Sequence, residues 1–227
     1  MVLGEKEWEN GRPYPPGEVA PHAGAFGRAR VRTCVDLPLT WQSPEMAETQ
    51  ILTFHGLADG GEHFALRVNG GAGDGPCLVR IHSECLTGDL FGSGRCDCGQ
   101  QLSEALRMMR DEGGVLIYLR QEGRGIGLYN KLDAYALQDC GLDTFEANLE
   151  LRLPADQRDY TVAAEMLRAM DIRTIRLLSN NPCKREQVEN AGISVAEVIP
   201  TGVYLNSLNW RYLAAKVTKA SHTIELD

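Results

Sequence analysis

Three cysteines lie close together near the middle of the chain and constrain how this region can fold. Cys85 belongs to the stretch 80–89, and Cys96 and Cys98 follow shortly after it. Three thiolates can hold one zinc ion, and catalytic zinc sites use three protein ligands and keep the fourth position for water or substrate. Structural zinc modules usually carry two paired arms, and the second arm is missing here. The spacing therefore favours an open zinc site, and a closed structural site with His82 as fourth ligand is the alternative.

The overall charge argues against one broad class of function. The 227 residues carry a formal net charge of -8, and 43% of them are hydrophobic. A nucleic-acid binder needs a basic face to replace phosphate counterions, so we expect no nucleic-acid partner. The length allows one substantial core and a small appendage. Any phosphate that the protein binds must therefore be held by a local cluster of cations.

Cysteine usage and hydropathy predict the cellular compartment. The chain has 7 cysteines, and those outside the cluster are scattered without the regular spacing of a secreted disulfide scaffold. No charged start followed by an apolar stretch occurs at the N-terminus, and no run of about 18 apolar residues occurs anywhere. We expect a cytoplasmic protein with reduced thiols and no membrane partner.

Composition divides the chain into two regions. Residues 1–45 are rich in Pro, Gly and Ala, and this composition predicts an extended N-terminal arm that packs on the body or on a partner subunit. Residues 46–227 alternate between strand-like and helix-like patterns and form the predicted main domain. The expected fold class is α+β, an α/β-type mixed sheet flanked by helices, with the strand order left open.

Hydrophobic periodicity locates the expected elements. Two strand-like runs, 50–56 and 63–69, flank the Gly60-Gly61 turn and predict a hairpin. Further strands are predicted where short apolar runs are bounded by turns, at residues 77–82, 115–119, 174–178 and 193–199. Helices are predicted where apolar residues recur at helical spacing, at residues 102–112, 128–137, 159–170, after Lys184, and at 210–217.

A glycine-rich loop, residues 122–127, lies between a predicted strand and a predicted helix. This order presents backbone amides to an anion. The glycine spacing differs from the dinucleotide-binding fingerprint, so a Rossmann site is poorly supported. Arg120, Arg124 and Lys131 concentrate positive charge around the loop, which favours a phosphate-bearing ligand. A solvated, charged helix start is the alternative interpretation.

Three other motifs are open to more than one interpretation. Asp156 and Arg158 precede a predicted helix, where a carboxylate commonly caps the helix. Tyr135 lies on the helix after the glycine loop, where an isolated tyrosine usually packs half-buried. His82-Ser-Glu84 matches half of a zinc deaminase signature, but the other half, Pro-Cys-x-x-Cys, does not follow, so a deaminase is a minor alternative.

Several motifs, taken in chain order, carry a resemblance to one enzyme family. They are Arg80-Ile-His-Ser-Glu-Cys-Leu-Thr-Gly-Asp, Arg95-Cys-Asp-Cys-Gly-Gln-Gln-Leu, Arg120-Gln-Glu-Gly-Arg-Gly-Ile-Gly-Leu, Asn130-Lys, Ala134-Tyr-Ala-Leu-Gln-Asp, Asp143-Thr-Phe-Glu-Ala-Asn and Asp156-Gln-Arg-Asp-Tyr. Together they closely resemble GTP cyclohydrolase II, the family that begins riboflavin synthesis. The resemblance runs densely from Arg80 to Lys184 and implies that residues 46–227 form a GTP cyclohydrolase II-like catalytic domain.

The resemblance implies a reaction and roles for particular residues. GTP is opened at its imidazole ring with loss of C8 as formate, and pyrophosphate is released to give 2,5-diamino-6-(5-phosphoribosylamino)pyrimidin-4(3H)-one. By similarity, the three cysteines hold the zinc ion that activates water for attack at C8, and Tyr135 belongs to the same part of the site. Asp156 is implied as proton acceptor and Arg158 as nucleophile on the α-phosphate. Since a guanidinium is effectively always protonated, stabilisation of the phosphoryl group is the plainer role for Arg158.

The resemblance also implies substrate contacts and partners. Positions matching the GTP contacts of the family are Arg80, Ile81, His82, Ser83, Glu84, Gln101, Glu122, Gly123, Arg124, Thr144, Ser179 and Lys184. Magnesium is expected to arrive with the triphosphate. A homodimer is expected, because homodimers are common and the resemblance points the same way.

Departures from the family pattern leave alternatives open. Ser179 stands in place of threonine, Cys183 in place of a basic residue, and Arg152 and Leu153 in place of a glycine and an aromatic residue near Asp156. A specialised paralogue in a secondary-metabolite pathway, or an enzyme that stops at the formamidopyrimidine, is one alternative. A non-enzymatic, zinc-stabilised regulator that binds guanine nucleotide is the alternative from another class.

Overall fold

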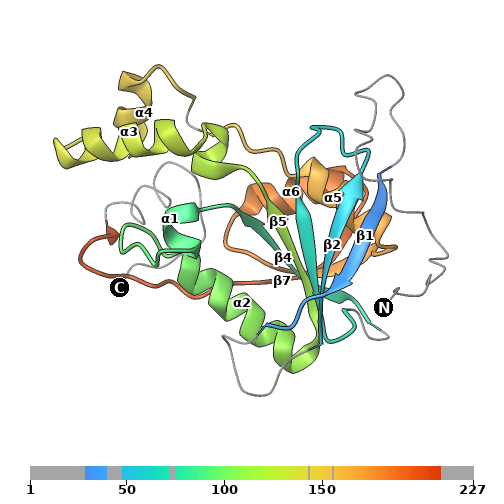
Figure 1. Ribbon diagram of the computed structural model, residues 1–227. Helices are drawn as coiled ribbons and strands as arrows, with labels where there is room; N and C mark the ends of the chain where they lie inside the picture. Colours follow the sequence, from blue (N-terminus) through green and yellow to red (C-terminus); the bar gives the residue numbers. More distant parts are fainter. Residues whose placement is uncertain (1–28, 40–47, 72–74, 143, 155, 211–227) are drawn as a thin grey trace, which may run out of the picture.

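A mixed seven-stranded β-sheet forms the centre of the protein (Figure 1). The computed structural model describes residues 29–39, 48–71, 75–142, 144–154 and 156–210. The strands, in chain order, are β1 (Arg30–Asp36), β2 (Thr49–His55), β3 (Phe64–Val68), β4 (Cys77–Ser83), β5 (Gly114–Leu119), β6 (Thr174–Leu178) and β7 (Ser194–Ile199). Their order across the sheet is β1-β2-β3-β5-β4-β6-β7. The expected mixed sheet flanked by helices is confirmed.

The sheet is antiparallel on one side and parallel on the other. β1, β2, β3 and β5 pair antiparallel in succession, and the predicted hairpin is the β2–β3 pair, with Leu52 opposite Ala65. β5, β4, β6 and β7 pair parallel in succession. Parallel strands bring their carboxyl ends to one edge, which is where ligands commonly bind in such sheets. Ser83, Leu119 and Leu178 therefore end three neighbouring strands at the same edge.

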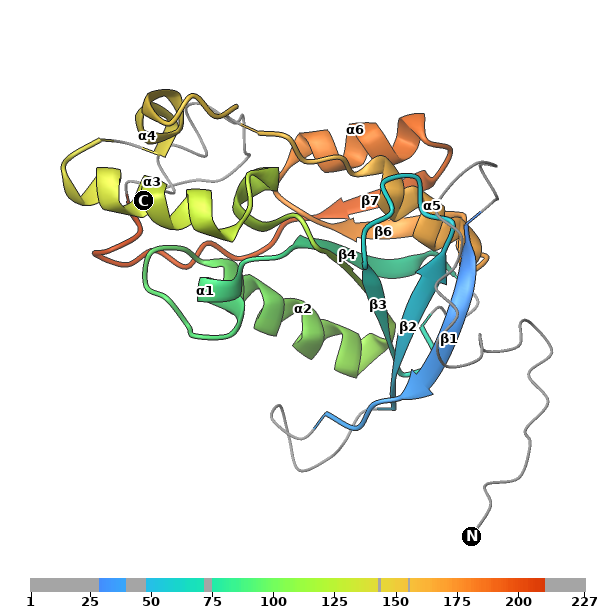
Figure 2. The same cartoon turned by 45° about the horizontal axis from the view of Figure 1, so that its top comes forward.

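Helices cover both faces of the sheet (Figure 2). The helices of the described residues are α1 (Leu86–Asp89), α2 (Cys98–Glu112), α3 (Leu128–Asp139), α4 (Thr144–Glu150), α5 (Thr161–Ala169) and α6 (Pro182–Asn190), with a short 3-10 helix, η1 (Glu122–Gly125). α2 packs on one face through Ala105, Leu106 and Met109. α5 and α6 contribute to the core on the other face. α3 and α4 pack on each other and extend beyond the sheet (Figure 1).

The sequence explains why these elements form. β5 is apolar along its whole length, and Val115, Ile117 and Leu119 face one core while Leu116 faces the other. Such a continuous apolar run is typical of a strand buried on both faces. α2 ends at Gly113, whose φ of +79° suits a residue without a Cβ. The predicted end of this helix is thereby confirmed.

The first 45 residues are described only in part. Arg30–Asp36, within the segment expected to be an arm, forms the edge strand β1, which pairs with β2. Residues 1–28 and 40–47 lie outside the described residues, and so does nearly all of the helix expected at 210–217. The division into an arm and a catalytic domain therefore stays a prediction. Within the described ranges, no helix is both long and apolar enough to cross a membrane.

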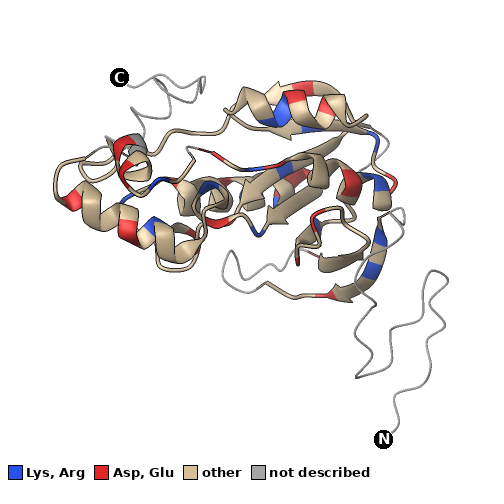
Figure 3. Cartoon of the chain, turned by 90° about the horizontal axis from the view of Figure 1, so that it is seen from above, with Lys and Arg blue, Asp and Glu red and all other residues tan. Residues whose placement is uncertain are grey.

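Charged residues are interspersed over the elements that the structure describes. Figure 3 shows Lys and Arg positions interspersed with Asp and Glu positions along the described elements. This arrangement agrees with the net charge of -8. A phosphate ligand must consequently find its cations in a local pocket.

Candidate metal centre and substrate pocket

The three cysteines meet at the carboxyl end of β4. Cys85 follows β4, Cys96 lies in the connecting loop, and Cys98 begins α2. Their sulfur atoms all lie within 4.8 Å of one another, and the Sγ atoms of Cys85 and Cys96 are 3.7 Å apart. A Cβ on Gly88 would lie 2.8 Å from the Cys96 Sγ, so only glycine fits against this cluster. Three converging sulfurs in a closely fitted cradle suit a thiophilic ion such as zinc.

His82 is not a member of this metal-binding group. Its Nε2 lies 3.0 Å from the Asp89 carboxylate, and the same carboxylate accepts hydrogen bonds from the Cys85 amide at 3.0 Å and the Tyr118 hydroxyl at 2.8 Å. Burial lowers the pKa of His82, so a neutral ring donates to Asp89. His82 therefore supports the loop that carries Cys85, which favours the open three-cysteine site over the closed one.

Hydrogen bonds among the three thiols shift their pKa values in opposite directions. Hydrogen bonds from Cys96 and Cys98 hold the pKa of Cys85 well below its usual range. The hydrogen bond with Cys85 raises the pKa of Cys96 to about 11, and the hydrogen bonds with Cys85 and Cys96 raise the pKa of Cys98 well above its usual value. A metal ion displaces such protons when it binds, because the thiolate is the ligand.

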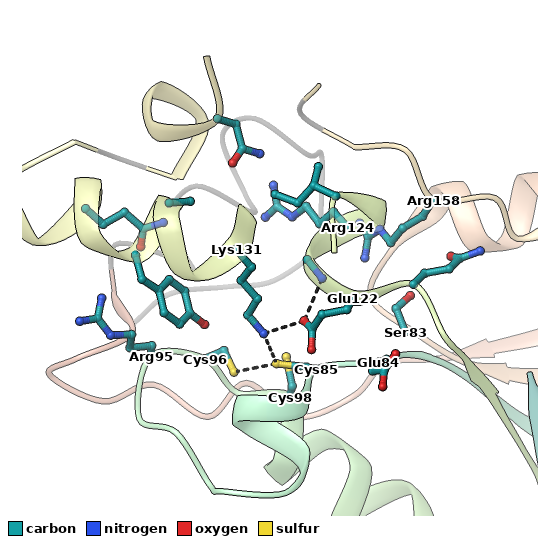
Figure 4. A pocket seen from close by; sticks show the side chains of 17 residues that line it. Ser83, Glu84, Cys85, Arg95, Cys96, Cys98, Glu122, Arg124, Lys131 and Arg158 are labelled. Atoms are coloured by element: carbon teal, nitrogen blue, oxygen red, sulfur yellow. Dashed lines mark hydrogen bonds and ion pairs between the residues drawn. The ribbon is translucent and has the colours of Figure 1, made fainter. Parts of the chain in front are cut away.

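A buried lysine–glutamate pair lies directly against the cysteines (Figure 4). The Lys131 Nζ is 3.2 Å from the Cys85 Sγ and 2.7 Å from the Glu122 Oε1. Burial alone would lower the pKa of Lys131, but the Cys85 thiolate and Glu122 outweigh it and raise this pKa. The Glu122 carboxylate also accepts from the amides of Leu86 at 2.6 Å and Gly123 at 2.8 Å. These contacts join the glycine loop to the cysteine cluster.

The glycine loop turns sharply beside the pocket. Gly123 and Arg124 both have left-handed backbone conformations, with φ of +63° and +62°. A Cβ on Gly125 would lie 2.9 Å from the Gln157 Cβ, so the loop packs closely on the segment before α5. The Arg124 side chain lines the pocket that this turn creates.

The segment from Asp156 to Arg158 contributes the Arg158 guanidinium to the pocket. The Arg158 Nε donates to the Asp156 Oδ1 at 2.9 Å, and the Arg158 amide donates to the same oxygen at 3.0 Å. Burial would raise the pKa of Asp156, but the hydrogen bonds and charge of Arg158 lower it. Asp159, not Asp156, accepts from the Thr161 amide at the start of α5, at 2.8 Å. The carboxylate at 156 therefore orients Arg158 and does not cap this helix.

Tyr135 faces the cysteines from α3. Its hydroxyl is 3.4 Å from the Thr87 Oγ1, and burial raises the pKa of the phenol. The Arg95 guanidinium lies 4.8 Å from the centre of the tyrosine ring and pairs with Asp139 at 2.7 Å. The phenol thus remains protonated at neutral pH and lines the same pocket as Cys85.

Sequence comparison identifies the family to which this arrangement belongs. The sequence model of GTP cyclohydrolase II matches residues 36–200. The chain belongs to the GTP cyclohydrolase II family. It is similar to GTP cyclohydrolase-2 of Psychromonas ingrahamii, with 49% identity over 197 residues that cover 86% of this chain and 97% of the relative. The protein is accordingly an enzyme of the GTP cyclohydrolase II type.

Two further relatives support this assignment. GTP cyclohydrolase-2 of Vibrio cholerae is 48% identical over 200 residues, covering 87% of this chain and 100% of the relative. The riboflavin biosynthesis protein RibBA of Cytophaga hutchinsonii is 46% identical over 191 residues, covering 84% of this chain and 46% of that longer protein. The predicted resemblance is therefore confirmed at the level of the family.

Some predicted substrate residues of this cyclohydrolase II line one pocket. They are Ser83, Glu84, Glu122, Gly123 and Arg124, together with Tyr135, Arg158 and the three cysteines. The Glu84 carboxylate accepts from the Arg120 Nε at 3.1 Å. One pocket thus holds both the candidate metal ligands and three arginines, Arg95, Arg124 and Arg158.

Other predicted substrate residues do not line the pocket and make hydrogen bonds within the protein. Arg80 is buried and donates to the Gln101 Oε1 at 2.8 Å and to the Leu178 carbonyl at 3.1 Å. Ile81 lies in the core, and its carbonyl accepts from the Lys184 Nζ at 2.7 Å.

The remaining two predicted contacts lie at the starts of helices. The Ser179 Oγ accepts from the Asn181 amide at 3.0 Å, just before α6. Thr144 is the first residue of α4. Ser179 is not among the described residues that line the pocket.

Several pocket residues were not selected from the sequence. They are Arg95, Gln121, Ile126, Ala134, Gln138 and Asn148. A signal existed for part of this set, because Lys131, Ala134, Tyr135 and Gln138 follow the spacing of one helix face. Asn148 lies on α4 and closes the motif Asp143-Thr-Phe-Glu-Ala-Asn, but the sequence analysis gave it no role of its own.

Proposed function

We propose that this member of the family opens the imidazole ring of GTP, releases C8 as formate and releases pyrophosphate. The product is 2,5-diamino-6-(5-phosphoribosylamino)pyrimidin-4(3H)-one. One observation carries this proposal: a single pocket is lined by three thiols on one side and by Arg124 and Arg158 on the other. Such a pocket can receive a purine at the metal and its phosphates at the arginines (Figure 4).

Cys85, Cys96 and Cys98 are the proposed zinc ligands. Zinc held there supplies water of lowered pKa, near 7, which is the nucleophile that opening a purine requires. The close fit of Gly88 against the cluster and the convergence of the three sulfur atoms within 4.8 Å of one another support this assignment.

Tyr135 is the proposed proton donor at the purine end. Its neutral phenol is held by packing under Arg95 and lies near Thr87. A positioned O–H group can donate a hydrogen bond or a proton as a C–N bond breaks. We assign Tyr135 to the removal of the formyl group, and its presence favours complete release of formate.

Arg158 and Arg124 are the proposed phosphate-binding groups. Asp156 accepts hydrogen bonds from the Nε and Nη2 atoms of Arg158, so the cation is already oriented before a substrate arrives. A fixed guanidinium stabilises charge that develops on a phosphoryl group. We therefore assign charge stabilisation to Arg158 and an orienting role to Asp156.

The predicted substrate residues that do not line the pocket have supporting roles in this proposal. Arg80, Gln101, Ser179 and Lys184 hold the carboxyl ends of β4 and β6 through their hydrogen bonds. His82 holds the loop of Cys85 through Asp89. Ile81 contributes its carbonyl and its core packing, and Thr144 is assigned a contact with GTP by its family position alone.

Magnesium, dimerisation and location complete the proposal. Magnesium ion accompanies the triphosphate, since such substrates bring the ion with several waters attached. The protein acts as a cytoplasmic homodimer in riboflavin biosynthesis; the name of the Cytophaga hutchinsonii relative supports the pathway.

Zinc removal combined with a product assay tests the proposed function. Zinc-loaded protein incubated with GTP and magnesium should release formate and pyrophosphate. Chelated protein should keep its far-ultraviolet circular dichroism and lose ring opening, because a catalytic metal is not needed for the fold. Unfolding on chelation, with no formate from the zinc-loaded protein, would instead indicate the non-enzymatic regulator.

A further inference from the structure

We propose that Lys131 is a positioning residue of the metal centre, which donates a hydrogen bond to the Cys85 thiolate while Glu122 holds it in place. This inference rests on the proposed zinc site. It assigns Lys131 and Glu122 to a bridge within the protein. The sequence had suggested phosphate binding for the first and GTP binding for the second.

The geometry of the bridge supports this role. The Lys131 ammonium lies 3.2 Å from the Cys85 Sγ and 2.7 Å from the Glu122 Oε1. The side chains of Lys131 and Glu122 are only 10% and 8% exposed. A lysine that bound phosphate from the pocket would have to leave a buried carboxylate and a thiolate, both of which hold its charge.

Glu122 is engaged through both of its carboxylate oxygens. Oε1 accepts from Lys131 and from the Gly123 amide, and Oε2 accepts from the Leu86 amide. These donors come from α3, from the glycine loop and from the residue after Cys85. Glu122 therefore ties three separate chain segments together, and Lys131 carries this connection to the sulfur.

The net charge of a zinc ion with three thiolates explains why a cation such as Lys131 would lie beside it. Three thiolates and Zn²⁺ together leave one negative charge on a site that is largely buried. Lys131 brings an ammonium group into contact with one of the thiolates, which stabilises the deprotonated sulfur and draws electron density from it. Residues that contact metal ligands in this way commonly change metal affinity by about 10- to 100-fold when replaced.

The test compares two buried lysines that lie on different helices. Lys131→Met removes the ammonium and keeps an unbranched side chain, and Lys131→Arg keeps the charge. Lys184→Met is the matched control, because Lys184 is similarly buried and its ammonium donates to the Ile81 carbonyl. Zinc affinity is measured by competition with a chromophoric chelator without GTP, and the visible spectrum of the cobalt-substituted protein reports on the metal–sulfur bonds.

We expect Lys131→Met to bind zinc about 10- to 100-fold more weakly than the wild type, with a shifted sulfur-to-cobalt band. Lys131→Arg should recover part of the zinc affinity. Lys184→Met should bind zinc with the same affinity as the wild type. If Lys131→Met does not fold, Lys131→Gln takes its place with the same expected loss of affinity.

Three results would overturn parts of the account in distinguishable ways. Unchanged zinc affinity and cobalt spectrum in Lys131→Met, with a raised KM for GTP, would make Lys131 a substrate ligand and refute the bridge. Equal losses in Lys131→Met and Lys184→Met would show a general effect of removing a buried lysine and also refute it. A wild-type protein that binds no zinc would refute the proposed function itself.

Discussion

The Gln157 amide donates a hydrogen bond to the Arg124 carbonyl at 2.9 Å and so joins the glycine loop to the segment that carries Asp156 and Arg158. Gly125 permits this contact, because a Cβ there would lie 2.9 Å from the Gln157 Cβ. The two candidate phosphate-binding arginines therefore depend on one close backbone approach.

Replacing Gly125 should disturb this approach. Gly125→Ala adds a Cβ at a φ of +92° and against Gln157, so we expect about 1–2 kcal/mol less unfolding free energy and roughly 10- to 100-fold slower pyrophosphate release. Gly192→Ala is the matched control, since its φ is +88° and a Cβ there meets no atom within 4 Å. Denaturant unfolding and a pyrophosphate assay measure the two effects. Equal activity losses in both variants would contradict the explanation.

Arg158 should be needed for the phosphate step. Arg158→Ala is expected to slow pyrophosphate release by about 10²- to 10³-fold, because a fixed charge is lost from the pocket. Arg158→Lys should retain part of the rate as a point charge without the planar fork. Arg152→Ala changes an exposed arginine that does not line the pocket and should keep the wild-type rate. Normal pyrophosphate release by Arg158→Ala would exclude both roles considered for this residue.

Asp156 should contribute stability that depends on pH. Its pKa is lowered in the folded protein from an ordinary value of 3.8, so its contribution is fully present above pH 3.8 and is lost as the pH falls through the folded-state pKa. Asp156→Asn should therefore be less stable than the wild type at neutral pH, by less than about 1 kcal/mol because the carboxylate is 42% exposed. The difference between the two proteins in denaturant unfolding should shrink as the pH falls below 3.8. A difference that stays constant to the lowest pH would contradict the ion pair.

Tyr135 should affect formate more than pyrophosphate. Tyr135→Phe keeps the ring against Arg95 and removes the hydroxyl, so we expect formate release to slow by about 10²-fold and a formylated product to accumulate. Tyr129→Phe on the same helix is the control, because Tyr129 is 82% exposed. Product masses and released formate distinguish the two variants. Unaltered formate release in Tyr135→Phe would remove this residue from the chemistry.

Arg152 should carry avoidable backbone strain. Its φ is +56°, a conformation that costs a residue with a Cβ about 1–2 kcal/mol. Arg152→Gly should raise the unfolding free energy by up to about 1 kcal/mol, after the extra flexibility of glycine in the unfolded chain is subtracted. Arg152→Ala keeps the Cβ and should give no such gain. The midpoints of denaturant unfolding compare the three proteins.

Local patterns were sufficient to predict most of the fold. The apolar run of β5, the helical spacing of Leu106 and Met109, and the hairpin of β2 and β3 all depend on neighbours in sequence. The edge strand β1 was not predicted, because a strand in a Pro- and Gly-rich segment is specified by its pairing with β2. Strand order likewise depends on long-range pairing that periodicity does not report.

The site was predicted less completely than the fold. The cysteine cluster could be predicted, because its ligands are close in sequence and chemically distinctive. The contact of Lys131 with Cys85 spans 46 residues, and a charged residue near a glycine loop suggests solvent or phosphate before it suggests a sulfur atom. The buried position of Arg80 is a second long-range feature. Its hydrogen bond to the Leu178 carbonyl depends on the parallel pairing of β4 with β6.

Mass spectrometry of the product tests the central claim most directly. Zinc-loaded wild-type protein is incubated with GTP and magnesium, and the product mass is measured together with released formate and pyrophosphate. We predict one formate and one pyrophosphate for each GTP consumed, and the mass of 2,5-diamino-6-(5-phosphoribosylamino)pyrimidin-4(3H)-one. A product that retains the formyl group, or GTP that remains intact, would contradict the account.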